Sequence, residues 1–174
     1  FVRHGIHGIP VALPHVMGSD GAGVVDSAGP GVTRVKPGDE VVLNPGISCG
    51  ECEFCLKGEH SLCTTFHLLG EHVAGTFAEY VVAPAVNAWP RPASLSWEES
   101  AAFPLVFLTA WRMLVTKARV RPGESLLIVG VGGGVAVAAL QIAKLLGMTV
   151  LVTSGSVEKL ARAKALGADA GIEP

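Results

Sequence analysis

All four cysteines of this 174-residue chain lie within the stretch CGECEFCLKGEHSLC. They are Cys49, Cys52, Cys55 and Cys63, which gives the spacing C-x2-C-x2-C-x7-C. Thiolates are soft ligands, and four of them close together in sequence can surround a tetrahedral Zn²⁺. Two disulfides or four free thiols are the alternatives, but bridges between such close neighbours would be strained. We therefore predict a zinc site. Four protein ligands leave no open coordination position, so we predict that the metal is structural and not catalytic.

A cysteine module could instead bind nucleic acid, which would require basic residues around it. The segment offers Lys57 against three glutamates, and the whole chain has 13 basic and 15 acidic residues with a formal net charge of −2. We therefore expect neither nucleic acid nor an anionic membrane as partner. Residues 126–143 carry no charge, but the glycines in their first half favour a buried strand, a turn and a helix over a membrane span.

A second chemical signal is the glycine-rich stretch VGVGGGVA, residues 129–136, which follows an apolar strand pattern and opens an Ala-rich helical pattern. Glycines in such a turn let backbone N–H groups approach a pyrophosphate at a helix N-terminus. Val135 stands where the plain G-x-G-x-x-G motif has its last glycine, and a looser register fits with a small alanine at 136. A tight strand–helix turn without a ligand is the alternative. We predict cofactor binding by Gly130, Gly132, Gly133, Gly134 and Val135.

The residue after the second strand of such a unit selects the cofactor, because an acid there binds the ribose 2′-OH of NAD. Counting 21 residues from Gly133 leads to Ser154, so no acid stands at this position. Ser154 can donate to a 2′-phosphate, and Lys159 can neutralise it, although an ordinary exposed lysine is the alternative. We predict NADP(H) in preference to NAD(H).

The elements that position these sites change character near residue 95. Before it, strand patterns at 21–29, 39–44 and 75–84 alternate with Pro and Gly turns, and the cysteine lobe is an excursion from the sheet. Ser96 and Glu99 form a capping box that opens a helix, and Pro104 starts a second helical stretch to residue 118. Strand, helix, strand and helix then follow at 125–131, 132–147, 149–154 and 156–167, and the chain ends where a third strand would begin. The fold class is α/β plus β, with a parallel sheet in the second part.

With both sites placed, the chain resembles the medium-chain dehydrogenase/reductase superfamily, which includes zinc-containing alcohol dehydrogenases and quinone oxidoreductases. The resemblance covers essentially all residues and includes LPHVMGSDGAGVV, VKPGDEVVLNPG, GTFAEYVVAP and LTAWRML. It implies a GroES-like catalytic domain at 1–95, with the structural zinc lobe at about 45–67. It implies connecting helices and the first half of a doubly wound Rossmann sheet at 96–174. It also implies that the chain is a fragment, and it places Thr109 near the nicotinamide end of the cofactor.

Zinc alcohol dehydrogenases of this superfamily hold a second, catalytic zinc. The resemblance puts a His-Glu pair of that site on Ser19 and Asp20, and a later cysteine ligand on Leu105. Ser and Leu do not replace His and Cys as zinc ligands, so we expect no catalytic zinc. The branch without that metal resembles quinone oxidoreductases and enone reductases. We therefore predict an NADPH-dependent oxidoreductase that transfers hydride to a quinone or an α,β-unsaturated carbonyl compound.

Two other functions stay open. One is a zinc-type alcohol dehydrogenase acting on a small alcohol or aldehyde, and the other is a cofactor-binding protein without turnover. The partners expected are a small-molecule substrate and further copies of the chain, as a dimer or tetramer, in the cytoplasm. No catalytic residue is assigned, since some of them are expected outside these residues.

Overall fold

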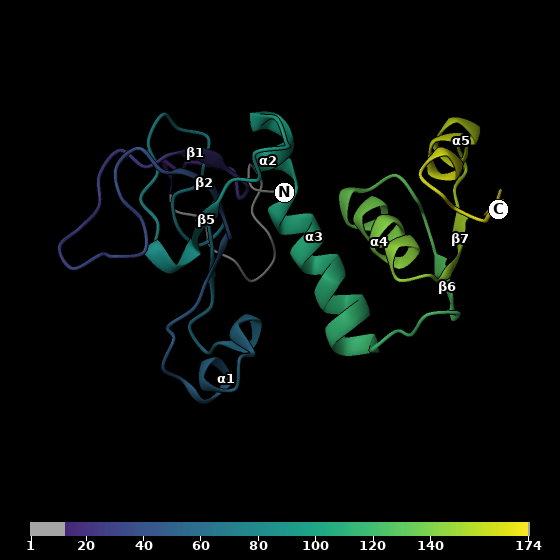
Figure 1. Cartoon of the computed structure of the whole chain (residues 1–174), viewed down its shortest axis with the longest axis horizontal. Coiled ribbons are helices and arrows are strands. Elements are labelled where there is room, and N and C mark those ends of the chain that lie inside the picture. The colour runs from purple at the N-terminus through teal and green to yellow at the C-terminus, as the bar shows by residue number, and fades with distance from the viewer. Residues whose placement is uncertain (1–12, 174) are drawn as a thin grey trace. The chain divides into compact units, whose positions relative to one another are not determined.

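The computed structural model describes residues 13–173, which form two compact units, one ending at Leu105 and one beginning at Val106 (Figure 1). The division falls later in the chain than residue 95, where the sequence pattern changes. The reason is that helix α2 (Trp97–Ala102) packs on the first unit, against strands β1 (Ala22–Val24) and β2 (Glu40–Leu43).

The first unit is built from two small antiparallel sheets. In the larger sheet β2 lies between β1 and β5 (Ala88–Pro90), and in the smaller one β3 (Gly46–Ile47) pairs with β4 (His67–Leu68). Between β3 and β4 the chain leaves the sheets to form the cysteine lobe, with helix α1 (Glu53–Leu56) and the 3₁₀ helix η2 (His60–Leu62). A second 3₁₀ helix, η3 (Ala85–Asn87), leads into β5. The two sheets thus carry the lobe that holds all four cysteines.

The prediction of a strand at 75–84 is wrong. Its first residues do bond to another segment, since the N–H groups of Thr76 and Phe77 donate to the carbonyls of Gly18 and Met17. Beyond them the backbone is irregular, and the side chains of Tyr80 and Val82 are 74% and 97% exposed. A strand forms only where a partner completes its ladder, and residues 13–173 supply none here. β-propensity alone cannot reveal that missing partner.

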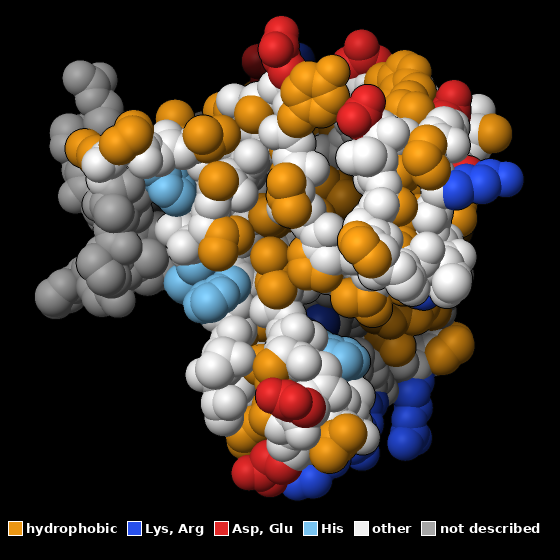
Figure 2. Space-filling view, turned by 90° about the vertical axis from the view of Figure 1, so that its left-hand side faces the viewer, with side chains coloured by type: hydrophobic (Ala, Val, Ile, Leu, Met, Phe, Trp, Pro, Cys, Tyr) orange, Lys and Arg blue, Asp and Glu red, His pale blue; other side chains and the backbone are white. Residues whose placement is uncertain are grey.

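Hydrophobic side chains are widespread on the face shown in Figure 2, among backbone and small polar groups. Acidic and basic side chains are both present in this view and lie mainly at its margins. This face therefore offers no broad basic surface for a polyanion.

The second unit is the βαβ arrangement that the sequence predicts. Helix α3 (Pro104–Trp111) contains the division between the units, since its first two residues belong to the first unit and the rest to the second. The π-helix η4 (Arg112–Ala118) follows it directly. The parallel sheet has the order β6-β7-β8, and the elements follow as β6 (Ser125–Ile128), α4 (Gly134–Leu145), β7 (Thr149–Thr153), α5 (Val157–Ala165) and β8 (Ala170–Ile172). Leu140 of α4 and Val150 and Val152 of β7 are fully buried in its core. The third strand, β8, is therefore formed, whereas the sequence predicts that the chain ends where this strand would begin.

The uncharged stretch at 126–143 divides among β6, the glycine turn and α4. Within residues 13–173, no helix combines the length and the apolar character needed to cross a membrane.

Candidate metal centre and cofactor site

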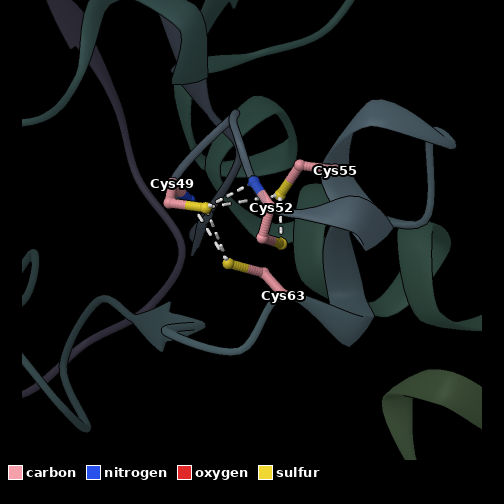
Figure 3. A group of neighbouring side chains, drawn as sticks. All are labelled: Cys49, Cys52, Cys55 and Cys63. Carbon is pink, nitrogen blue, oxygen red and sulfur yellow. Dashed lines mark hydrogen bonds between the residues drawn. The ribbon is translucent and has the colours of Figure 1, made fainter.

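The four cysteines come together although they lie on different local elements (Figure 3). Cys49 follows β3, Cys52 precedes the first turn of α1, Cys55 lies within α1, and Cys63 follows η2. Cys55 and Cys63 are buried. Among the described residues they form the one group of at least three His, Cys, Asp or Glu side chains that could hold a metal ion.

The sulfur positions fit a tetrahedral metal ion. The Sγ–Sγ distances are 3.9 Å for Cys49–Cys55, 3.5 Å for Cys52–Cys55 and 3.5 Å for Cys63–Cys49, and all four sulfurs lie within 4.8 Å of one another. Four sulfurs bound at about 2.3 Å to one Zn²⁺ would stand about 3.8 Å apart. None of the four is in a disulfide. The donor set and the spacing therefore fit zinc with a closed shell.

The thiols differ in acidity because their surroundings differ. Burial raises the pKa of Cys55 to about 11, whereas the backbone N–H of Cys55 lowers the pKa of Cys52 to about 6. The N–H of Cys49 donates to the sulfur of Cys63 at 3.3 Å and lowers its pKa. A dication would stabilise all four thiolates together, as required for metal binding.

The predicted cofactor turn joins β6 to α4, and its glycines meet specific spatial demands. Gly130 has φ of +78°, and its N–H donates to Thr153 Oγ1 at 3.1 Å. A Cβ on Gly134 would lie 2.9 Å from Val106 Cγ1, so a larger residue there would need Val106 to move. Gly133 is the N-cap of α4 and has no side chain to bond the first N–H groups of the helix. In the part of the chain that the structure describes, this twelve-residue helix therefore has an exposed N-terminus without a side-chain cap from its N-cap residue, which favours a phosphate ligand.

Lys159 of α5 reaches the same turn. A Cβ on Gly132, whose φ is +132°, would lie 2.8 Å from Lys159 Cδ, so the alkyl chain of the lysine lies against this glycine. The basic side chain that the sequence assigns to a 2′-phosphate is thereby brought to the glycine turn before α4, which the spacing in sequence does not reveal.

Ser154 and Thr109 occupy different parts of the second unit. Ser154 directly follows β7, is buried, and accepts a hydrogen bond from the N–H of Ser156 at 3.2 Å, which leaves its hydroxyl proton able to donate. Thr109 is half-buried in α3. Val135, which follows Gly134 in α4, packs against the core of the unit.

A further set of polar contacts involves Ser19, Asp20 and Leu105, and two of these positions, Ser19 and Leu105, are those expected to lack catalytic zinc ligands. Ser19 Oγ donates to the carbonyl of Leu69 at 2.8 Å, and Asp20 Oδ1 accepts the N–H of Leu105 at 2.9 Å. Burial raises the pKa of Asp20, and the N–H of Leu105 opposes that rise. Asp20 and Leu105 are 85 residues apart, so no local pattern predicts this bond.

The described residues thus combine a cysteine lobe with a parallel βαβ unit that opens on a glycine turn, and comparison with known proteins agrees with this arrangement. The model of the alcohol dehydrogenase GroES-like domain matches residues 2–93. The chain therefore belongs to this family, within the medium-chain dehydrogenase/reductase superfamily.

Three relatives show the range of the similarity. A crystal structure of an NAD-dependent alcohol dehydrogenase is 60% identical with a TM-score of 0.90, covering 94% of this chain and 48% of that one. An alcohol dehydrogenase of Schizosaccharomyces pombe is 38% identical, covering 92% of this chain and 46% of the relative. A quinone oxidoreductase of Rattus norvegicus is 35% identical, with 91% and 40% covered. The chain thus spans about half the length of the relatives it matches.

Proposed function

We propose that the whole protein is a nicotinamide-dependent oxidoreductase that interconverts an alcohol and a carbonyl compound, the function that the sequence analysis placed second. The observation that carries the proposal is the uncapped N-terminus of α4 behind a glycine turn, in a chain 60% identical to an NAD-dependent alcohol dehydrogenase. The backbone N–H groups at this end of α4 bind the pyrophosphate, and Lys159 adds a positive charge. Thr109 lies at the nicotinamide end.

We propose that the cofactor is NADP(H), because Ser154 stands where an acid would bind the ribose of NAD. The NAD-dependent relative makes NADH the competing cofactor. Binding of NADPH and NADH, followed by the fluorescence of the reduced nicotinamide, should show tighter binding of NADPH. The variant Ser154→Asp should reverse that order, since a carboxylate would repel the 2′-phosphate and accept a bond from a free 2′-OH. Tighter binding of NADH by the unchanged protein would refute the assignment.

The four cysteines, Cys49, Cys52, Cys55 and Cys63, are proposed to hold one structural Zn²⁺. The ion would supply a cross-link between α1, η2 and the end of β3, and its closed shell has no position for substrate. Elemental analysis after dialysis should give one zinc per chain. Cys63→Ser should lose that zinc and lower the thermal midpoint, whereas Ser61→Ala, a neighbouring exposed position, should keep both. Two zinc ions per chain would instead indicate a catalytic metal.

A quinone or enone reductase is the second candidate, and one observation favours it. The positions that resemble catalytic zinc ligands hold Ser19, whose hydroxyl donates to Leu69 O, and Leu105, whose side chain offers no donor atom. These residues do not fit a catalytic zinc, so stabilisation of an alkoxide by that metal is not available from them. An enone or quinone acceptor needs only hydrogen-bond donors at its oxygen.

The deciding experiment uses the full-length protein with both reactions. Alcohol-dependent reduction of NADP⁺ or NAD⁺ supports the first function, and quinone-dependent oxidation of NADPH without alcohol activity supports the second. Cofactor binding without turnover of either substrate class would instead support a non-catalytic protein. A homodimer or homotetramer is expected when the protein is intact, which light scattering on the eluting protein would test.

A further inference from the structure

We propose that Asp20 is a positioning residue whose carboxylate caps helix α3 and so sets the position of Thr109 on that helix. The assignment of Thr109 to the nicotinamide end rests on the proposed function. The cap itself does not, because it is a contact between two parts of the first unit. Asp20 Oδ1 accepts the N–H of Leu105 at 2.9 Å.

Helix α3 needs a cap from elsewhere in the chain. The residue before it is Phe103, whose side chain has no hydrogen-bond acceptor, and its first residue, Pro104, has no N–H. Leu105 therefore supplies the first backbone N–H within α3, and this N–H donates to the Asp20 carboxylate. A carboxylate at this end also interacts favourably with the positive end of the helix dipole. Asp20 supplies both the acceptor for the Leu105 N–H and the negative charge near the start of α3.

The backbone around Asp20 is held by hydrogen bonds and by close packing of neighbouring backbone segments. Thr76 Oγ1 donates to the carbonyl of Asp20, and the N–H of Thr76 donates to the carbonyl of Gly18 at 2.8 Å. Gly70 and Gly75 pack against Gly18 so closely that a Cβ on either would lie within 2.4 Å of its carbonyl oxygen. The carboxylate thus projects from a backbone segment that has little room to shift.

The cap acts on the part of α3 that leads to Thr109. Leu105 and Thr109 are four residues apart, so they follow each other on one face of the helix. If the first turn frays, the helix face that carries Thr109 is no longer fixed at its N-terminal end. Loss of the cap should therefore disturb the alignment of the cofactor for hydride transfer more than its overall binding.

The test compares Asp20→Ala and Asp20→Asn in the full-length protein with Asp26→Ala and Asp26→Asn. Asp26 is an exposed aspartate that follows β1 in the same segment. Asp20→Ala should raise amide hydrogen exchange of the peptide 104–111 at least tenfold and lower kcat about tenfold. It should change the KM for the cofactor less than threefold. Asp20→Asn keeps an acceptor oxygen and should restore most of the protection and the rate, and both Asp26 variants should match the wild type.

If Asp20→Ala does not fold, Asp20→Glu serves instead, because it keeps the charge but moves the carboxylate by one methylene. It should also increase exchange at 104–111. Unchanged exchange in the variant that folds, or Asp20→Asn as impaired as Asp20→Ala, would overturn the proposal. A wild-type protein without turnover would count against the proposed function alone, because the exchange measurement tests the cap without any activity.

Discussion

Gly75→Ala isolates the backbone packing behind Ser19 and Asp20. A Cβ added to Gly75 would lie 2.2 Å from the carbonyl oxygen of Gly18, 2.6 Å from Gly70 Cα and 2.6 Å from the carbonyl oxygen of Met17. All three atoms are backbone atoms, so no flexible side chain can move aside. Gly75 is not among the glycines with positive φ, and alanine suits its conformation otherwise. The expected cost is thus the steric overlap alone.

The overlap exceeds what a small adjustment can relieve, since normal carbon–oxygen contacts are longer by about 1 Å. Inserting one methyl group into well-packed surroundings costs about 1–3 kcal/mol, and rigid backbone on every side places this case at about 3 kcal/mol. Gly23→Ala is the matched control, because nothing lies within 4 Å of its added Cβ and its φ is not positive. There the reduced entropy of the unfolded chain should stabilise by about 0.4–1 kcal/mol.

Urea unfolding of the full-length protein, followed by the tryptophan fluorescence of Trp89 and Trp97 in the first unit, measures both variants. The two midpoints should move in opposite directions, with free energies of unfolding that differ by about 3–4 kcal/mol if the transition is two-state. A Gly75→Ala protein within about 0.5 kcal/mol of the wild type would refute the close packing of Gly18, Gly70 and Gly75.

Three further changes test other parts of the chain. Ser100 is fully buried, and its hydroxyl has no hydrogen-bond partner among residues 13–173. Ser100→Ala should therefore stabilise the protein by about 1 kcal/mol in urea unfolding, and destabilisation by this variant would contradict the assignment. Removing the Ser96 cap should destabilise the protein by about 1 kcal/mol. The hydrogen bond from Lys144 holds the pKa of Asp169 below its usual value, so the stability it provides is present above the unfolded pKa of about 3.9 and is lost as pH falls through the lower folded pKa. In thermal melts at different pH values, Asp169→Asn should reduce the loss of melting temperature as the pH is lowered through this range. An unchanged dependence of melting temperature on pH would be evidence against the Asp169–Lys144 ion pair.

The features that could be predicted from sequence are those whose cause is local. The capping box is confirmed in both directions, with the N–H of Glu99 donating to Ser96 Oγ at 3.1 Å and the N–H of Ser96 donating to the Glu99 carboxylate at 2.9 Å. The alternation of β6, α4, β7 and α5 follows from hydrophobic periodicity and glycine turns. The cysteine cluster is likewise confirmed as a cluster, because its ligands lie within fifteen residues and can converge through one lobe.

Features that depend on distant partners were not predictable in this way. The segment at 75–84 has the composition of a strand, but its pairing depends on another segment. Helix character is expected to residue 118, yet residues 112–118 form a π-helix that ends at Arg119 with φ of +53°. The approach of Lys159 to Gly132 depends on how α5 packs. In each case tertiary packing, and not local propensity, decides the outcome.

The contacts of Ser19, Asp20 and Leu105 explain how the fold can persist without metal ligands at these positions. The segment of Ser19 and Asp20 is fixed by backbone packing at Gly18, which does not depend on the side chains at 19 and 105. The bond from Leu105 N–H to Asp20 joins that segment to the start of α3. Because this connection uses a backbone N–H and the Asp20 carboxylate, it does not require zinc-binding side chains at positions 19 and 105.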